Sequence, residues 1–182
     1  MEQTRERPAY RLAACGVMAA VLCVLGPLSI PIGPVPVTLA TLVVYLMAYL
    51  LGWKWGTVSC LVYLMVGMAG LPVFSGYRAG TGALLGPTGG YLIGYLPMAL
   101  LSGWVMERTD KRVLHLLGMI LGTAFCYLLG TTWFCWQGGY TVGAAMGLCV
   151  LPFIPFDLVK MLVVLAVGPV VRRRLKAARL LA

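Results

Sequence analysis

The chain of 182 residues is 61% hydrophobic and only 10% charged, whereas an ordinary soluble domain is about 45–50% apolar and about 25% charged. This composition excludes a soluble globular protein. Six spans of about 20 residues would use about 120 residues and leave no room for a separate extramembrane domain. No lysine follows a glycine, so the chain has no phosphate-binding GxxxxGK[ST] loop. We therefore expect any ATP hydrolysis to occur in a partner protein.

Clusters of glycine, proline and charge divide the chain into six apolar segments, since a membrane span must satisfy its own backbone hydrogen bonds. The first segment covers residues 10–26 and ends where four prolines among residues 27–36 prevent regular helix. The other five cover residues 37–52, 55–71, 91–106, 113–137 and 152–171. We therefore expect an all-α integral membrane protein, with six transmembrane helices in one membrane domain over residues 1–182.

The basic residues indicate the orientation of these spans. When successive loops are assigned to alternate sides, 12 of the 14 lysines and arginines fall on one side, which the positive-inside rule makes cytoplasmic. Arg78 lies on the outer side and Lys160 within the last span. Both termini are then cytoplasmic in a multi-pass protein of the plasma membrane. Because the basic residues lie at helix ends and tails and not along one polar face, they do not indicate a nucleic-acid partner. The 12 residues are Arg5, Arg7, Arg11, Lys54, Arg108, Lys111, Arg112, Arg172, Arg173, Arg174, Lys176 and Arg179.

One acidic residue departs from this charge pattern. Asp157 lies near the outer end of the last span, three residues before Lys160, so the two side chains share one helical face. An ionisable group in a span costs about 2.5–3.5 kcal/mol near the centre and usually marks a ligand or ion path. The alternative is a self-neutralising pair near the membrane interface. Pro152 and Pro155 loosen the first helical turn and favour a polar pocket.

The two long outer loops supply further candidate residues. The first loop is rich in proline, and the loop after the third span is rich in glycine, which lets backbone groups approach a ligand closely. Simple interfacial turns are the alternative for both loops. We expect the loops to converge with Asp157 and Lys160 on a small pocket that opens to the outside, where Arg78 attracts an anionic ligand. The loop residues expected there are Val37, Gly76, Arg78, Thr88, Gly89, Gly90 and Tyr91.

A stripe of small residues marks the first span. Its members follow one another at spacings of 4, 3 and 4 residues, which allows another helix to approach closely. Two interpretations stay open: the stripe packs against a neighbouring span of this chain, or it docks a separate membrane subunit. The residues are Ala9, Ala13, Gly16 and Ala20.

The residue inventory argues against catalysis and metal binding. An aspartyl intramembrane protease needs two carboxylates in one site, whereas Asp157 stands alone in the spans. Ser75 and His115 are predicted on opposite sides, about 30 Å apart, which is too far for proton transfer. A metal enzyme needs a cluster of histidine and carboxylate ligands that this chain lacks. Capture of a solute is therefore the function that these residues favour, with no catalytic residue and no metal.

Four sequence runs together resemble one known family. They are residues 30–39 (IPIGPVPVTL), 70–76 (GLPVFSG), 85–92 (LGPTGGYL), and 152–155 (PFIP) followed by Asp157 and Lys160. The chain resembles, over nearly its whole length, the BioY family of substrate-binding S components of energy-coupling-factor (ECF) biotin transporters. The resemblance implies a six-helix S-component bundle that binds biotin near the outer face. It also implies a transmembrane coupling subunit and two cytoplasmic ATPases as partners, and no cofactor.

The resemblance further implies roles for the site residues. Asp157 would accept hydrogen bonds from the ureido N–H groups of biotin, Lys160 would keep Asp157 charged, and Arg78 would meet the ligand carboxylate. The chain departs from the family pattern at Ala40, Tyr77 and Phe156, where Gln, Gly and Gly are frequent. An S component for another vitamin, such as thiamine or riboflavin, and a membrane scaffold without a small ligand are the alternatives.

Overall fold

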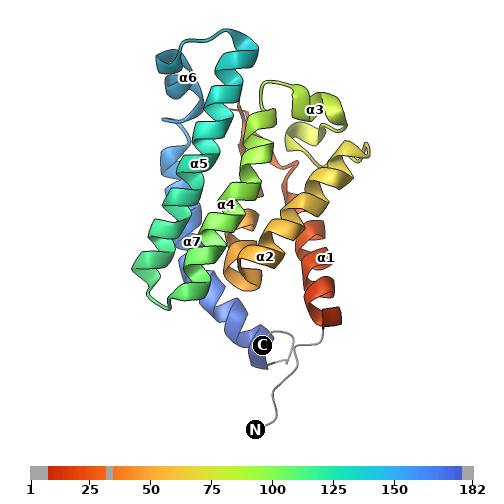
Figure 1. Cartoon of the computed structure of the whole chain (residues 1–182), viewed down its shortest axis with the longest axis vertical. Coiled ribbons are helices and arrows are strands. Elements are labelled where there is room, and N and C mark those ends of the chain that lie inside the picture. Colours follow the sequence, from red (N-terminus) through yellow and green to blue (C-terminus); the bar gives the residue numbers. More distant parts are fainter. Residues whose placement is uncertain (1–7, 32–34, 178–182) are drawn as a thin grey trace.

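Helices carry nearly all of the regular structure in the computed structural model, which describes residues 8–31 and 35–177 (Figure 1). Two-residue strands β1 (Ser29–Ile30) and β2 (Val37–Thr38) pair antiparallel between the first two helices, and a 3-10 turn, η1 (Ser75–Tyr77), follows the second. The predicted all-α class is confirmed. The basic residues Arg5, Arg7 and Arg179 lie outside the described residues. The helices are α1 (Pro8–Leu25), α2 (Ala40–Met68), α3 (Thr81–Leu85), α4 (Gly89–Arg108), α5 (Arg112–Gly138), α6 (Val142–Cys149) and α7 (Ile154–Ala177).

The second and third predicted spans form the two arms of α2, which reverses direction at Gly52. The φ angle of Gly52 is +74°, a conformation that glycine adopts without steric cost. A Cβ atom on Gly56 would lie 3.4 Å from the Cα of Ala48, although eight residues of straight helix would separate the two positions by about 12 Å. The arms therefore pack against each other, and the expected boundary between residues 52 and 55 is a tight helical reversal.

The helical segments run alternately up and down the bundle. In Figure 1, α1 rises, the first arm of α2 descends, its second arm rises, α4 descends, α5 rises and α7 descends. The start of α1 and the end of α7 consequently lie at the same end. Four helices, α2, α4, α5 and α7, are long and apolar enough to cross a membrane, while the apolar stretch Ala9–Leu25 of α1 is shorter. The count of six spans and the cytoplasmic orientation of both termini stay predictions.

Helix α4 lies between α2 and α5 and brings their side chains to a common core. Close approach requires glycine here: a Cβ atom on Gly103 would lie 2.6 Å from the backbone nitrogen of Trp53 in α2. On the other side, a Cβ atom on Gly122 of α5 would lie 2.8 Å from the carbonyl oxygen of Met98. These contacts pack α4 closely against both neighbours (Figure 1), and the candidate site lies at the start of α4.

The last part of the chain differs from the expected pattern. Helix α6 was not predicted, because residues 142–149 form a short apolar segment with two glycines. Its start is capped by Thr141, whose hydroxyl accepts a hydrogen bond from the N–H of Ala144, and such caps stabilise helix starts. Helix α7 begins at Ile154 and extends to Ala177, beyond the predicted end at residue 171. Asp157 therefore lies in the first turn of α7.

Candidate ligand-binding site

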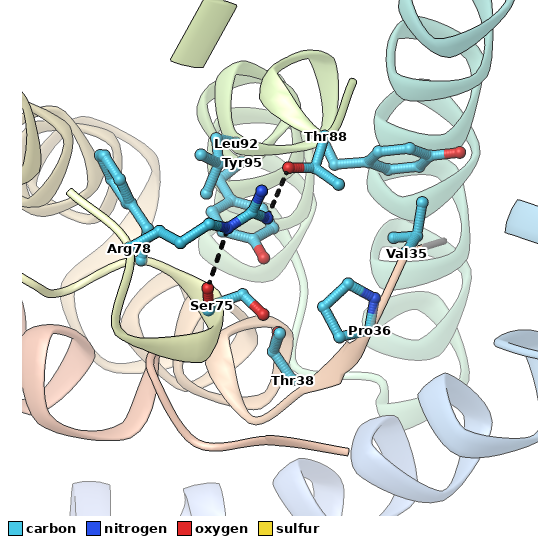
Figure 2. Close-up of a pocket in the computed structure, with 10 residues that line it drawn as sticks. Val35, Pro36, Thr38, Ser75, Arg78, Thr88, Leu92 and Tyr95 are labelled. Atoms are coloured by element: carbon cyan, nitrogen blue, oxygen red, sulfur yellow. Dashed lines mark hydrogen bonds between the residues drawn. The ribbon is translucent and has the colours of Figure 1, made fainter. Parts of the chain in front are cut away.

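A partly open cavity lies beside the loop that joins α1 to α2 (Figure 2). Its walls come from this loop, from the segment around η1 and from the start of α4. Ligand pockets combine apolar walls with a few polar groups, as this cavity does. The lining residues are Val35, Pro36, Thr38, Phe74, Ser75, Arg78, Thr88, Tyr91, Leu92 and Tyr95.

Arg78 is the one charged residue among those that line this cavity in the described part of the chain. Its Nη2 atom donates to the hydroxyl oxygen of Thr88 at 2.9 Å, and its Nε atom donates to the carbonyl oxygen of Ser75 at 3.3 Å. Figure 2 shows the guanidinium group between these two residues. The hydroxyl oxygen of Ser75 is buried and has no hydrogen-bond partner among the described residues. Arg78, Thr88 and Ser75 thus form a polar end of the cavity.

Tyr91 reaches the cavity because α5 leaves space for its ring. The ring packs directly over Gly130, and a Cβ atom at that position would overlap the ring atoms. The Tyr91 hydroxyl group lies 3.1 Å from the hydroxyl oxygen of Thr131, also in α5. The α4–α5 contact therefore fixes the aromatic wall of the cavity, to which Tyr95 contributes one turn further along α4.

Asp157 and Lys160 form the expected pair and belong to a larger polar cluster. The Lys160 Nζ atom lies 2.9 Å from Oδ1 of Asp157, and both side chains are mostly buried, with 11% and 5% exposed. The hydroxyl group of Thr41, in the first arm of α2, donates to the same Oδ1 atom at 3.0 Å and accepts from Lys160 at 2.8 Å. The hydroxyl group of Tyr127, in α5, donates to Oδ2 at 2.6 Å. We call these four residues the Asp157 cluster.

The Asp157 cluster lies beside the cavity and outside its lining. Thr38 lines the cavity and precedes Thr41 by three residues, which an extended backbone covers in about 11 Å at most. The start of α2 therefore connects the cavity wall to the buried carboxylate. The structure brings together two halves of the predicted site: Arg78, Thr88 and Tyr91 line the cavity, and Asp157 pairs with Lys160 next to it.

The remaining predicted loop residues shape the site without lining the cavity. The N–H of Gly76 donates to the carbonyl oxygen of Pro27 at 3.1 Å, which joins the two outer loops. Gly89 packs against the backbone of Leu84, and Gly90 packs against Trp133 of α5. Val37 is buried in β2, opposite Ile30 of β1.

Five polar residues of the site were not predicted from the sequence. Each is a neutral hydroxyl residue, and none carries a charge that would stand out within an apolar segment. The residues are Thr38, Thr41, Ser75, Tyr95 and Tyr127.

The small-residue stripe of α1 lies on the outside of the bundle. Ala9, Ala13, Gly16 and Ala20 are all exposed, and a Cβ atom on Gly16 would meet no atom within 4 Å. Buried residues of α1, such as Leu22, occupy another face. Packing within this chain therefore does not account for the stripe, and docking of another subunit stays a prediction.

Comparison with known proteins identifies the family. The model of the BioY family matches residues 1–177. The chain belongs to the BioY family. Among the BioY proteins, "Biotin transporter BioY" of Thermotoga maritima is 36% identical over 153 residues, which cover 84% of this chain and 90% of the relative. "Biotin transporter BioY" of Rhodobacter capsulatus is 38% identical over 164 residues, which cover 81% and 85% of the two chains.

A solved structure shows the same fold as this BioY family member. It is the crystal structure of "the S-component for biotin from an ECF-type ABC transporter", with a TM-score of 0.86 and 29% sequence identity over 94% of this chain and 95% of the other. The chain therefore has the fold of an ECF S component. Membership of a membrane transporter family, together with several apolar helices, makes it a multi-pass membrane protein and not an enzyme.

Proposed function

We propose that this chain is the biotin-binding S component of an ECF-type transporter in the plasma membrane. It captures biotin at the outer face, with both termini cytoplasmic, and delivers the vitamin inward with a transmembrane coupling subunit and two cytoplasmic ATPases. The names of its relatives and the fold of the solved biotin S component support this proposal. The observation that carries it is a cavity lined by aromatic and apolar side chains, beside a buried Asp157–Lys160 pair.

The Asp157 cluster has the hydrogen-bonding capacity that a ureido group requires. An ionised carboxylate offers about four acceptor positions, and Lys160, Thr41 and Tyr127 occupy three of them. The remaining position accepts a ureido N–H group in a charge-assisted hydrogen bond, which is about twice as strong as a neutral one. The Lys160 ammonium group has three protons, of which two are directed to Asp157 and Thr41. The third donates to the ureido oxygen.

The rest of the cavity suits the apolar part of biotin. Val35 and Pro36 from the first outer loop line the cavity together with Phe74 and Leu92, and Tyr91 and Tyr95 supply aromatic surface. Apolar contact of this kind favours the thioether ring over water. The first loop forms the cover, since strands β1 and β2 and the Pro27–Gly76 hydrogen bond hold it in place. We propose that this cover opens to admit biotin.

Delivery requires a surface for the coupling subunit. The exposed stripe of Ala9, Ala13, Gly16 and Ala20 on α1 allows a partner helix to approach closely. This stripe lies away from the cavity-lining residues, so docking and ligand capture use separate surfaces. ATP hydrolysis in the partner ATPases then drives release of biotin to the cytoplasm.

Ligand-dependent stabilisation tests the proposal. A ligand at 100 times its Kd stabilises the folded state by about 2.7 kcal/mol, so biotin should raise the thermal unfolding midpoint of the detergent-purified chain. Thiamine and riboflavin at the same concentration are the matched controls and should leave the midpoint unchanged. A shift with one of these vitamins instead would assign a different ligand, and no shift with any of them would favour a membrane scaffold. Uptake by proteoliposomes that contain the coupling subunit and ATPases, with ATP, tests delivery.

A further inference from the structure

The end of the bundle opposite the cavity carries a positive charge. The reversal of α2, the α4–α5 turn and the end of α7 all lie there (Figure 1). Two acidic residues, Glu107 and Asp110, belong to these segments, and the basic residues outnumber them. This end therefore attracts anions. The basic residues whose side chains the structure describes there are Lys54, Arg108, Lys111, Arg112, Arg172, Arg173 and Arg174.

Two of these cations lie over tryptophan rings. The Nζ atom of Lys54 is 5.2 Å from the centre of the Trp53 ring, at the start of the second arm of α2. The Cζ atom of Arg108 is 4.0 Å from the centre of the Trp104 ring, at the end of α4. Lys54, Trp104 and Arg108 are exposed. Because the ring attracts the cation, each charge is held in place before a ligand arrives, which lowers the entropic cost of binding.

The two cation–ring pairs flank the point where α2 and α4 cross. A Cβ atom on Gly103, the residue before Trp104, would lie 2.6 Å from the backbone nitrogen of Trp53. The two backbones therefore touch between the pairs. Tryptophan is enriched at the membrane–water interface, and long basic side chains near helix ends extend into the headgroup region. The crossing consequently presents two cations at the level of the lipid headgroups.

Apolar side chains continue this surface toward the middle of the bundle. Val58 and Leu61 in the second arm of α2 and Leu100 in α4 are exposed large hydrophobic residues. They precede or follow the two cations by one to two helical turns, on helices that pack against each other. A lipid whose headgroup lies at the crossing thus finds apolar surface for its acyl chains.

Glu107 is the acidic residue at the crossing. Its Oε1 atom lies directly over Gly52, where a Cβ atom would overlap it. This position is the start of the second arm of α2, and the N-terminus of a helix stabilises a negative charge. Neither Lys54 nor Arg108 forms an ion pair with another described residue. The two cations therefore keep the capacity to bind an anion from outside the described part of the chain.

We infer that Lys54 and Arg108 bind the headgroup of an anionic phospholipid where α2 and α4 cross. The lipid phosphate accepts charge-assisted hydrogen bonds from both cations. A glycerol headgroup leaves the lipid with a net negative charge, whereas a choline headgroup adds a cation that Lys54 and Arg108 repel. The tryptophan rings would attract a quaternary ammonium group, but Lys54 and Arg108 already lie over them. The site therefore selects phosphatidylglycerol over phosphatidylcholine.

Native mass spectrometry of the full-length chain, released from detergent with one of the two lipids added, tests this inference. The Kd for phosphatidylglycerol should be lower than that for phosphatidylcholine by about fivefold or more. Each cation near a membrane surface contributes about fivefold in affinity for anionic lipid. The double variant Lys54→Gln/Arg108→Gln should therefore weaken binding of phosphatidylglycerol by about 25-fold. Lys54→Arg/Arg108→Lys conserves both charges and should keep the preference for phosphatidylglycerol.

Arg173→Gln/Arg174→Gln is the matched control, because it removes two exposed cations from α7 at the same end of the bundle. It should change the Kd for phosphatidylglycerol by less than about twofold. Equal weakening in the two glutamine double variants would show a diffuse attraction by the basic end and would overturn the inference. Equal affinity of the unsubstituted chain for the two lipids, or loss of the preference in Lys54→Arg/Arg108→Lys, would overturn it as well.

Discussion

Replacement of Asp157 by asparagine removes the charge of the buried ion pair and keeps its shape. Asp157 is 4% exposed and accepts hydrogen bonds from Lys160, Thr41 and Tyr127. An asparagine amide presents one acceptor and two donors, so its NH₂ group would face at least one of these donors. Lys160, with 11% of its side chain exposed, would then be a mostly buried cation without a counter-ion.

The expected cost follows from the burial of the pair. Removal of one member of a buried ion pair destabilises proteins by about 3–5 kcal/mol, whereas joint replacement of both members by apolar groups is often neutral. For a chain of 150–250 residues, 1 kcal/mol corresponds to about 2–4 °C in the unfolding midpoint. Asp157→Asn should therefore lower the midpoint by roughly 6–20 °C. The double variant, with Lys160→Met added, should recover most of this loss.

Two measurements on the same samples separate stability from binding. Thermal unfolding in detergent should rank the chains as unsubstituted, then the double variant, then Asp157→Asn. Biotin titration should show strongly weakened binding in both variants, because each lacks the carboxylate that accepts the ureido N–H group. If the double variant is as unstable as Asp157→Asn, the charge on Lys160 is not what destabilises the single variant. If the double variant binds biotin as tightly as the unsubstituted chain, Asp157 does not contact the ligand.

Two further predictions concern packing and docking. Gly130→Ala should displace the Tyr91 ring, which packs directly over Gly130, and so weaken the biotin binding measured by titration. Gly143→Ala, where a Cβ atom would meet no other atom within 4 Å, is the control. Equal biotin affinities of the two variants would show that Tyr91 does not contribute to the site. Ala13→Trp on the exposed stripe should leave biotin binding unchanged and abolish ATP-dependent uptake by proteoliposomes with the partner subunits. Leu128→Trp, at an exposed position on α5, is the control and should retain uptake. Normal uptake with Ala13→Trp would refute docking by the stripe.

The sequence predicted the helical segments because charge and helix-breaking residues mark their ends. Gly52 separates two apolar runs in the sequence, and in the structure it reverses α2 with a positive φ angle. The sequence does not reveal that α2 continues through this reversal, because backbone hydrogen bonding depends on the packing of both arms. Helix α6 was missed since its eight residues are shorter than any membrane span.

The charged residues of the site were predicted from the sequence, and its hydroxyl residues were not. Asp157 and Lys160 were identifiable because a charge is rare and costly inside a membrane. Arg78 was identifiable because it is the one basic residue that the charge pattern places on the outer side. Thr41 and Tyr127, which complete the Asp157 cluster, carry no such signal, because a hydroxyl residue is common in apolar helices. Asp157, to which both donate, lies 116 residues from Thr41 and 30 residues from Tyr127 in the chain. Only the assembled bundle shows which helical faces meet.

The most direct test of the account is isothermal titration of the detergent-purified chain with biotin, in the absence of any coupling subunit. The account predicts saturable binding of one biotin per chain, with a negative heat-capacity change because the apolar cavity walls are buried against the ligand. Absence of binding heat at every temperature, together with no stabilisation of the chain by biotin, would contradict the assignment of this cavity and the Asp157 cluster as a biotin site.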